Sequence, residues 1–259
     1  MRSLLSILAA LALFASAAQA KMITKSLDYQ SGQVACRGFL AYDDKFEGKR
    51  PGVLIAHQWL GLTNYEKTRA VQLASLGYVA FALDLYGKGN TPKDAAAAGP
   101  LAGSFKANRT LWRQRANDGL RALQAQPNVD TQNIAAIGYC LGGGTVLELA
   151  RSGADVKGVL SFHGTLDTPT PQDAKNIKGK VLVLHGAIDP YSPMPTVLAL
   201  SDEMEHAKVD YHIDLYGGAV HSFTQPDAGN DPSKGAAYNA QADARSFEAM
   251  IAFFNEIFR

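Results

Sequence analysis

The sequence has few cysteines and no excess of charge of either sign. Only two cysteines, Cys36 and Cys140, occur among 259 residues, so one disulfide at most is possible. Cys36 falls in an early strand-like segment and Cys140 at a sharp turn between a strand and a helix, so we expect both thiols to be free. The 25 basic and 24 acidic side chains give a formal net charge of +1. Such a balanced surface gives no indication of nucleic acid or an acidic membrane as a partner.

The sequence also lacks an apolar run long enough for a permanent membrane anchor. Its longest apolar stretch, Leu4 to Ala18, has about fifteen residues, whereas a membrane-spanning helix needs ~20. Arg2 precedes this stretch, and Ala18-Gln19-Ala20 follows as the small-x-small pattern typical of signal-peptide cleavage. We therefore predict a signal peptide over residues 1–20 and a periplasmic or secreted mature protein. An uncleaved anchor is the alternative.

Apolar strand-like runs alternate with segments of helical spacing along the rest of the chain. The expected strands are 52–56, 78–83, 134–137, 158–164, 181–186 and 209–215, after an antiparallel hairpin over 26–42. The expected helices are 65–76, 105–126, 145–150, 193–207 and 236–258, and 91–103 is expected to be a loop with some alanine-rich helical character. This alternation predicts an α/β fold, a mostly parallel sheet with helices on both faces. Without an internal repeat, we expect residues 21–259 to form a single domain.

A cysteine lies where a buried strand turns into a helix. In Gly138-Tyr139-Cys140-Leu141-Gly142 it occupies the position of serine in the G-x-S-x-G nucleophile elbow. Glycines flank such a turn because neighbouring Cβ atoms would collide with the strand or the helix. We predict that Cys140 is a nucleophile and that the Leu141 amide faces a developing oxyanion. A glycine-rich turn around a buried cysteine is the alternative.

A nucleophilic cysteine needs a base and a group that orients the base. His221 is the candidate base, because it alone among six histidines lies in a long, glycine-containing connection before the last helix. Asp189, in the short loop after the 181–186 strand, is the candidate acid, with Asp167 and Asp214 as rivals. The order nucleophile, acid, histidine is that of the α/β-hydrolases.

The other residues at strand ends provide a second candidate oxyanion donor and no pattern typical of a metal site. The amide of Trp59, in the loop after an early strand, is the predicted second oxyanion donor. The other histidines are expected to be structural (His57, His163 and His185) or at the surface (His206 and His212). There is no H-x-x-H pattern or acidic companion, so we predict no metal.

With these features the chain resembles the dienelactone hydrolase family of α/β-hydrolases from about Ser26 onward. The motifs that carry the likeness are Gly138 to Gly143, Asp84-Leu85-Tyr86, His185-Gly186 through Asp189, and Gly218 through Phe223. The resemblance implies a triad of Cys140, Asp189 and His221. It also implies hydrolysis of an ester or lactone through a thioester intermediate, without a metal or an organic cofactor.

The chain departs from the family pattern at two places. Gln58 stands where the family has a glutamate beside the resting thiol, so ionisation of Cys140 would depend on protonated His221 and the helix N-terminus. The family arginines that hold a substrate carboxylate are replaced by Thr224-Gln225 and by Lys88. We therefore expect an ester that is less acidic or bulkier than the dienelactone.

The predicted function is hydrolysis of a small-molecule ester or lactone by a monomer or homodimer. After signal cleavage we expect neither nucleic acid nor a membrane as partner. The expected substrate contacts are Gln58, Trp59, Tyr86, Lys88, Trp112 and Ser222. A thioesterase or peptidase with the same triad is one alternative, and a non-catalytic binding protein on a hydrolase fold is another.

Overall fold

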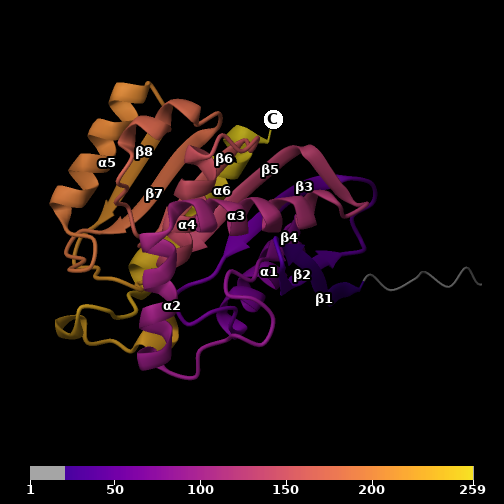
Figure 1. Cartoon of the computed structure of the whole chain (residues 1–259), viewed down its shortest axis with the longest axis horizontal. Coiled ribbons are helices and arrows are strands. Elements are labelled where there is room, and N and C mark those ends of the chain that lie inside the picture. Colours follow the sequence, from indigo (N-terminus) through magenta and orange to yellow (C-terminus); the bar gives the residue numbers. More distant parts are fainter. Residues whose placement is uncertain (1–20, 259) are drawn as a thin grey trace, which may run out of the picture.

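The computed structural model describes residues 21–258, which form one mixed sheet of eight strands (Figure 1). The strands are β1 (Met22–Ser31), β2 (Val34–Asp43), β3 (Arg50–Ala56), β4 (Val79–Ala82), β5 (Val129–Tyr139), β6 (Gly158–Phe162), β7 (Lys180–Gly186) and β8 (Tyr211–Tyr216). Their order in the sheet is β1-β2-β4-β3-β5-β6-β7-β8. β1 and β2 form the predicted antiparallel hairpin, β2 is antiparallel to β4, and all other pairs are parallel. The predicted signal peptide lies outside the described residues and stays a prediction.

Helices cover both faces of the sheet. They are α1 (Asn64–Ser75), α2 (Ala95–Ala107), α3 (Arg109–Gln124), α4 (Leu141–Arg151), α5 (Met194–Ala207) and α6 (Ala240–Ile257), with short 3-10 turns η1 (Pro171–Asn176), η2 (Pro226–Ala228) and η3 (Pro232–Lys234). Apolar side chains of α3, α4 and α5 pack in one core cluster, and those of α1 and α6 pack in the other. This is the predicted three-layer α/β fold.

The central strand β3 shows why both layers are needed. Val53, Leu54 and Ile55 are all fully buried. Successive side chains of a strand point to opposite faces, so Leu54 packs with α3 and α4 while Val53 and Ile55 pack with α1 and α6. Each such burial stabilises the fold by roughly 1.5–3 kcal/mol. The continuous apolar run in the sequence is therefore the signature of a strand covered on both sides.

The helix expected over 105–126 is in fact two helices that meet at Asn108. The backbone angles of Asn108 (φ −126°, ψ 83°) are not helical, and the side-chain oxygen of this residue accepts a hydrogen bond from the Leu111 amide at 3.0 Å. Asparagine is among the best N-cap residues, so it begins α3 and ends α2. The segment expected as a loop over 91–103 contains most of α2, whose first turn is capped by Asp94.

Charged side chains are buried between α3, α4 and α5. Arg151 is fully buried, and its guanidinium donates to both carboxylate oxygens of Glu203 at 2.7 Å. It also donates to Glu148 at 3.1 Å. Arg113 of α3 donates to the other oxygen of Glu148 at 2.7 Å. Each buried carboxylate thus has an arginine partner, and the cluster links the three helices.

Both cysteines are free, as predicted. Cys36 is buried in β2, and Cys140 is half-buried just after β5. Between residues 21 and 258 no helix is both long and apolar enough to span a membrane.

Candidate active site

The carboxyl ends of three parallel strands bring Cys140, Asp189 and His221 together. Cys140 directly follows β5, Asp189 lies in the loop after β7, and His221 lies in the connection after β8. In an open parallel sheet these ends share one edge, which is where such folds bind ligands. The residues are far apart in sequence and meet because of the strand order.

Cys140 lies at a strained turn. Its backbone angles are φ 56° and ψ −115°, and α4 begins at the next residue. A Cβ atom at Gly138 would lie 1.9 Å from the Gly142 carbonyl oxygen, and one at Gly142 would lie 2.0 Å from the Ala56 oxygen. Only glycine fits at either position. Strain of this kind is held at sites where it positions a reactive group, and here it holds the thiol above the sheet edge.

Asp189 orients the ring of His221. The Asp189 carboxylate receives a hydrogen bond from His221 Nδ1 at 2.7 Å. Its other oxygen accepts from the Tyr191 amide at 2.8 Å and the Ser192 amide at 3.2 Å. Burial alone would raise the pKa of Asp189, but these bonds and the charge of His221 lower it. An ionised carboxylate requires the proton on Nδ1, which leaves Nε2 of His221 for the sulfur.

The sulfur of Cys140 and the imidazole of His221 share a hydrogen bond, and each shifts the pKa of the other toward the charged form. Burial alone would raise the pKa of the Cys140 thiol, but the charge and hydrogen bond of His221 lower it. Burial alone would lower the pKa of His221, but the Cys140 sulfur and Asp189 raise it to about 10. The two pKa shifts therefore favour a thiolate beside an imidazolium, the charge state in which a cysteine is most reactive.

Two backbone amides face the same sulfur. The amides of Leu141 and Trp59 both hydrogen-bond to Cys140 and contribute to lowering its pKa. Leu141 is the first residue of α4, and Trp59 lies in the loop after β3. Two converging N–H groups beside a nucleophile form the geometry of an oxyanion hole.

A cavity of about 370 Å³ opens onto Cys140 and His221. Its lining consists of Trp59, Gly99, Ala102, Gly103, Lys106, Cys140, Leu141, Thr165, Tyr191, Ser192, His221, Ser222 and Ala236. Trp59 and Ser222 were expected there. The contribution of α2 was missed, because its glycines and proline predict a loop. Tyr191 and Ser192 lie two and three residues after Asp189, so their position in the loop after β7 was the signal that could have found them.

Four of the expected substrate contacts do not line this cavity. Lys88 is exposed and pairs with Asp28 at 3.2 Å. Tyr86 is buried and donates its hydroxyl proton to the Trp59 carbonyl oxygen at 2.7 Å. The side chain of Gln58 is also buried and forms no hydrogen bond with the residues that the structure describes.

Trp112 is the clearest correction. It is fully buried beneath α4, where its indole nitrogen donates to Thr145 Oγ1 at 2.7 Å. We expect Trp112→Phe to lower the free energy of unfolding by about 1–2 kcal/mol, because it removes one buried hydrogen bond and part of the ring volume. The Michaelis constant for an ester should not change. Urea unfolding and steady-state kinetics check both; a raised Michaelis constant at unchanged stability would restore Trp112 to the pocket.

The remaining histidines lie as the sequence predicted. His57, His163 and His185 are buried at strand ends, and His206 and His212 are exposed. His163 lies beside the ring of His221 with a centroid distance of 5.2 Å and is held by Thr224 at 2.9 Å. No cluster of three or more His, Cys, Asp or Glu side chains within residues 21–258 could hold a metal ion.

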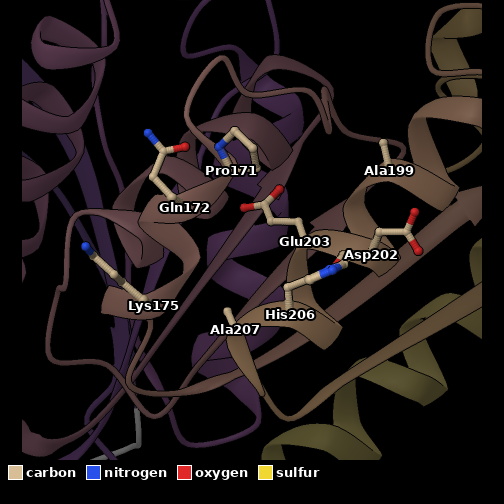
Figure 2. A pocket seen from close by; sticks show the side chains of 8 residues that line it. All are labelled: Pro171, Gln172, Lys175, Ala199, Asp202, Glu203, His206 and Ala207. Carbon is tan, nitrogen blue, oxygen red and sulfur yellow. The ribbon is translucent and has the colours of Figure 1, made fainter.

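A larger cavity of about 620 Å³ lies between η1 and α5. Figure 2 shows its lining: Pro171, Gln172 and Lys175 on one side and the side chains of α5 on the other. None of the candidate site residues belongs to it, and it contains no cysteine or serine that could act as a nucleophile. The cavity beside Cys140 is therefore the candidate active site despite its smaller volume.

Known proteins match this chain over most of its length. The profile of the dienelactone hydrolase family matches residues 36–258. A solved dienelactone hydrolase-like promiscuous phosphotriesterase from metagenomic libraries is 42% identical, with a TM-score of 0.86 over 91% of this chain and 98% of that one. Another solved structure, named m3DLH, is 40% identical, with a TM-score of 0.88 over the same shares of 91% and 98%. A Saccharolobus solfataricus protein with the provisional name carboxymethylenebutenolidase is 27% identical over 268 residues, which cover 90% of this chain and 98% of the relative.

The matched region contains Cys140, Asp189 and His221 together with both amides that face the sulfur. It also contains all strands from β3 to β8. The chain belongs to the dienelactone hydrolase family of α/β-hydrolases.

Proposed function

We propose that the protein hydrolyses a carboxylic ester or lactone through a thioester on Cys140. The observation that carries this proposal is the pairing of the Cys140 sulfur with His221, whose ring is held by Asp189 at 2.7 Å. A structural cysteine needs neither a strained turn nor an imidazole partner. Family membership and the carboxymethylenebutenolidase relative support the same reaction class.

The proposed reaction has two halves. The Cys140 thiolate attacks the ester carbonyl carbon, and the carbonyl oxygen becomes an oxyanion that the Trp59 and Leu141 amides stabilise. The tetrahedral intermediate collapses with cleavage of the C–O bond, and His221 Nε2 donates its proton to the leaving alkoxide. Neutral His221 then takes a proton from water, which attacks the thioester and releases the carboxylic acid and the free thiolate.

The residues that line the cavity indicate the size and polarity of the substrate. Trp59, Leu141 and the small residues of α2 give it apolar walls, Lys106 adds a basic side chain, and no acidic side chain among the described residues lines it. We propose a small-molecule ester with a bulky, weakly polar group as the substrate. From the pattern in residues 1–20 we propose action in the periplasm or outside the cell, and a monomer or homodimer remains our prediction.

Iodoacetamide tests the proposal because it alkylates a thiolate far faster than a thiol. We expect one label per chain, on Cys140, and loss of p-nitrophenyl acetate hydrolysis in proportion to labelling. The Cys36→Ala variant is the control, because Cys36 is fully buried and burial, with the nearby Asp84 charge, raises the pKa of its thiol to about 11. Labelling of Cys140 at the rate of an ordinary thiol would instead favour a non-catalytic binding protein.

The pH dependence of alkylation and of hydrolysis distinguishes the ionisation of Cys140 from that of His221. Alkylation should stay fast below pH 9.0, the ordinary thiol pKa, and fall only as pH drops through the lowered pKa of Cys140. Hydrolysis of an alkyl ester should share that acid limb and show an alkaline limb near pH 10, where His221 loses the proton that the leaving alkoxide needs. Alkylation should have no alkaline limb, because the thiolate persists. An alkaline fall in both rates would contradict these assignments.

A second candidate function is hydrolysis of a phosphotriester. The relative that is 42% identical over 91% of this chain carries that activity in its name. The Cys140 thiolate would attack phosphorus and displace an aryloxide. Rates with a nitrophenyl phosphotriester, lactones, aryl esters, thioesters and a peptide amide would rank this candidate against the esterase, thioesterase and peptidase alternatives.

A further inference from the structure

His57 is a buried side chain that the proposed reaction does not use. It directly follows β3, is fully buried, and packs edge-on against Tyr86 with a centroid distance of 4.9 Å. Both of its ring nitrogens have partners: Nδ1 lies 2.6 Å from the Gln58 carbonyl oxygen, and the Leu85 amide nitrogen lies 3.1 Å from Nε2. The sequence indicated only a structural histidine at this position.

The two contacts determine the tautomer of His57. A backbone amide can only donate, so Leu85 N–H donates to Nε2 and this nitrogen carries no proton. Burial lowers the pKa of His57, with partial opposition from Glu66, so the ring is neutral. A neutral imidazole carries one proton, and since this proton is not on Nε2 it is on Nδ1. His57 Nδ1–H therefore donates to the Gln58 carbonyl oxygen at 2.6 Å.

The acceptor of this bond belongs to the peptide unit that faces the nucleophile. The carbonyl of Gln58 and the N–H of Trp59 are the two ends of one planar amide. Fixing the carbonyl on one side therefore fixes the direction of the N–H on the other, which hydrogen-bonds to the Cys140 sulfur. Donation to the carbonyl oxygen also polarises the amide and strengthens its N–H as a donor.

Neighbouring side chains hold the rest of this loop, and among side chains of the described residues His57 alone contacts that peptide unit. Glu66 accepts from the Gln58 amide at 3.3 Å, and Tyr86 donates to the Trp59 carbonyl at 2.7 Å, so both act on adjacent peptide units. Within residues 21–258, the one other donor to the Gln58 carbonyl is the backbone amide of Gly61 at 3.1 Å, in the same turn. We propose that His57 is a positioning residue of the oxyanion hole, which aims and polarises the Trp59 amide through the Gln58 carbonyl.

This inference rests on the proposed acyl transfer at Cys140, and two amide variants test it. His57→Asn retains an N–H donor near the position of Nδ1, whereas His57→Gln places its amide near the position of Nε2, where it can accept only from Leu85. We expect His57→Gln to lower kcat for p-nitrophenyl acetate by roughly tenfold to a hundredfold, below the ~10²–10³ of losing a whole donor. The Asn variant should keep kcat within about threefold, and KM should change little in either.

Alkylation separates this role from general damage to the site. Displacement of iodide by the thiolate forms no oxyanion, so both variants should be alkylated at Cys140 at the wild-type rate on the alkaline plateau of the alkylation profile, where the thiol is ionised whatever the Trp59 amide contributes to its pKa. That result, together with a low kcat in His57→Gln alone, supports the proposal. Equal kcat in the two variants, a lower kcat in His57→Asn than in His57→Gln, or alkylation that falls in parallel with hydrolysis overturns it. Failure of the proposed function would look different: Cys140→Ala would still hydrolyse the ester.

Discussion

Cys140→Ala is expected to lower kcat for ester hydrolysis by roughly 10⁴-fold or more, the size of loss seen when a nucleophile of a triad is removed. The variant keeps the Trp59 and Leu141 amides and the His221–Asp189 pair, so it can still bind and polarise an ester. It has no group that can form the acyl intermediate. Steady-state rates with p-nitrophenyl acetate, corrected for the rate in buffer, provide the measurement.

The controls for this variant come from the chain itself. Cys36→Ala removes the other thiol at a site that is buried in β2, and it should keep full activity. Cys140→Ser keeps the shape of the side chain but not its acidity, because a hydroxyl cannot form a resting ion pair with His221. Its kcat should fall between those of the wild type and Cys140→Ala. Retention of more than about one hundredth of the wild-type kcat in Cys140→Ala would contradict covalent catalysis at this position.

Arg151→Met is expected to lower the free energy of unfolding by about 3–5 kcal/mol, the usual cost of leaving a buried charge without its partner. The change removes two 2.7 Å bonds to Glu203, and Glu148 keeps Arg113. The carboxylate of Glu203 would then remain beneath α5 without a cation. Urea-induced unfolding monitored by circular dichroism measures the loss.

A double variant distinguishes unpaired charge from lost packing. Arg151→Met with Glu203→Leu removes both charges, so most of the lost stability should return. Arg151→Lys keeps a charge but loses the two-pronged contact with Glu203, and we expect an intermediate loss. A double variant no more stable than Arg151→Met would mean that the volume of the arginine, not its charge, stabilises the helix interface.

The sheet and the candidate triad could be predicted because local patterns determine them. A strand buried on both faces must be apolar throughout, as in Val53-Leu54-Ile55, and a nucleophile elbow must have glycine where Gly138 and Gly142 meet the backbone. Chain order then places Asp189 and His221 after later strands. These constraints act within a few residues of each feature, so the sequence carries them.

The walls of the cavity could not be predicted, because they depend on contacts between distant segments. Gly99 and Pro100 are typical of a loop, yet tertiary packing and the Asp94 cap make that segment a helix over the site. Nothing near Trp112 indicates whether its indole faces the cavity or Thr145. Lys88 has the charge expected of a substrate ligand, but the position of Asp28 in β1 draws it to the surface.

The Cys140 thiol lies far from the other cysteine, and this has a consequence for oxidative damage. The other cysteine, Cys36, is fully buried in β2, and β4 and β3 separate that strand from β5. A sulfenic acid formed on Cys140 by peroxide would therefore have no second cysteine within the chain with which to condense. Repair would depend on a thiol from solution, and without one the sulfur would advance to the irreversible sulfinic acid. Intact-mass spectrometry after peroxide treatment, with and without added glutathione, would distinguish these fates.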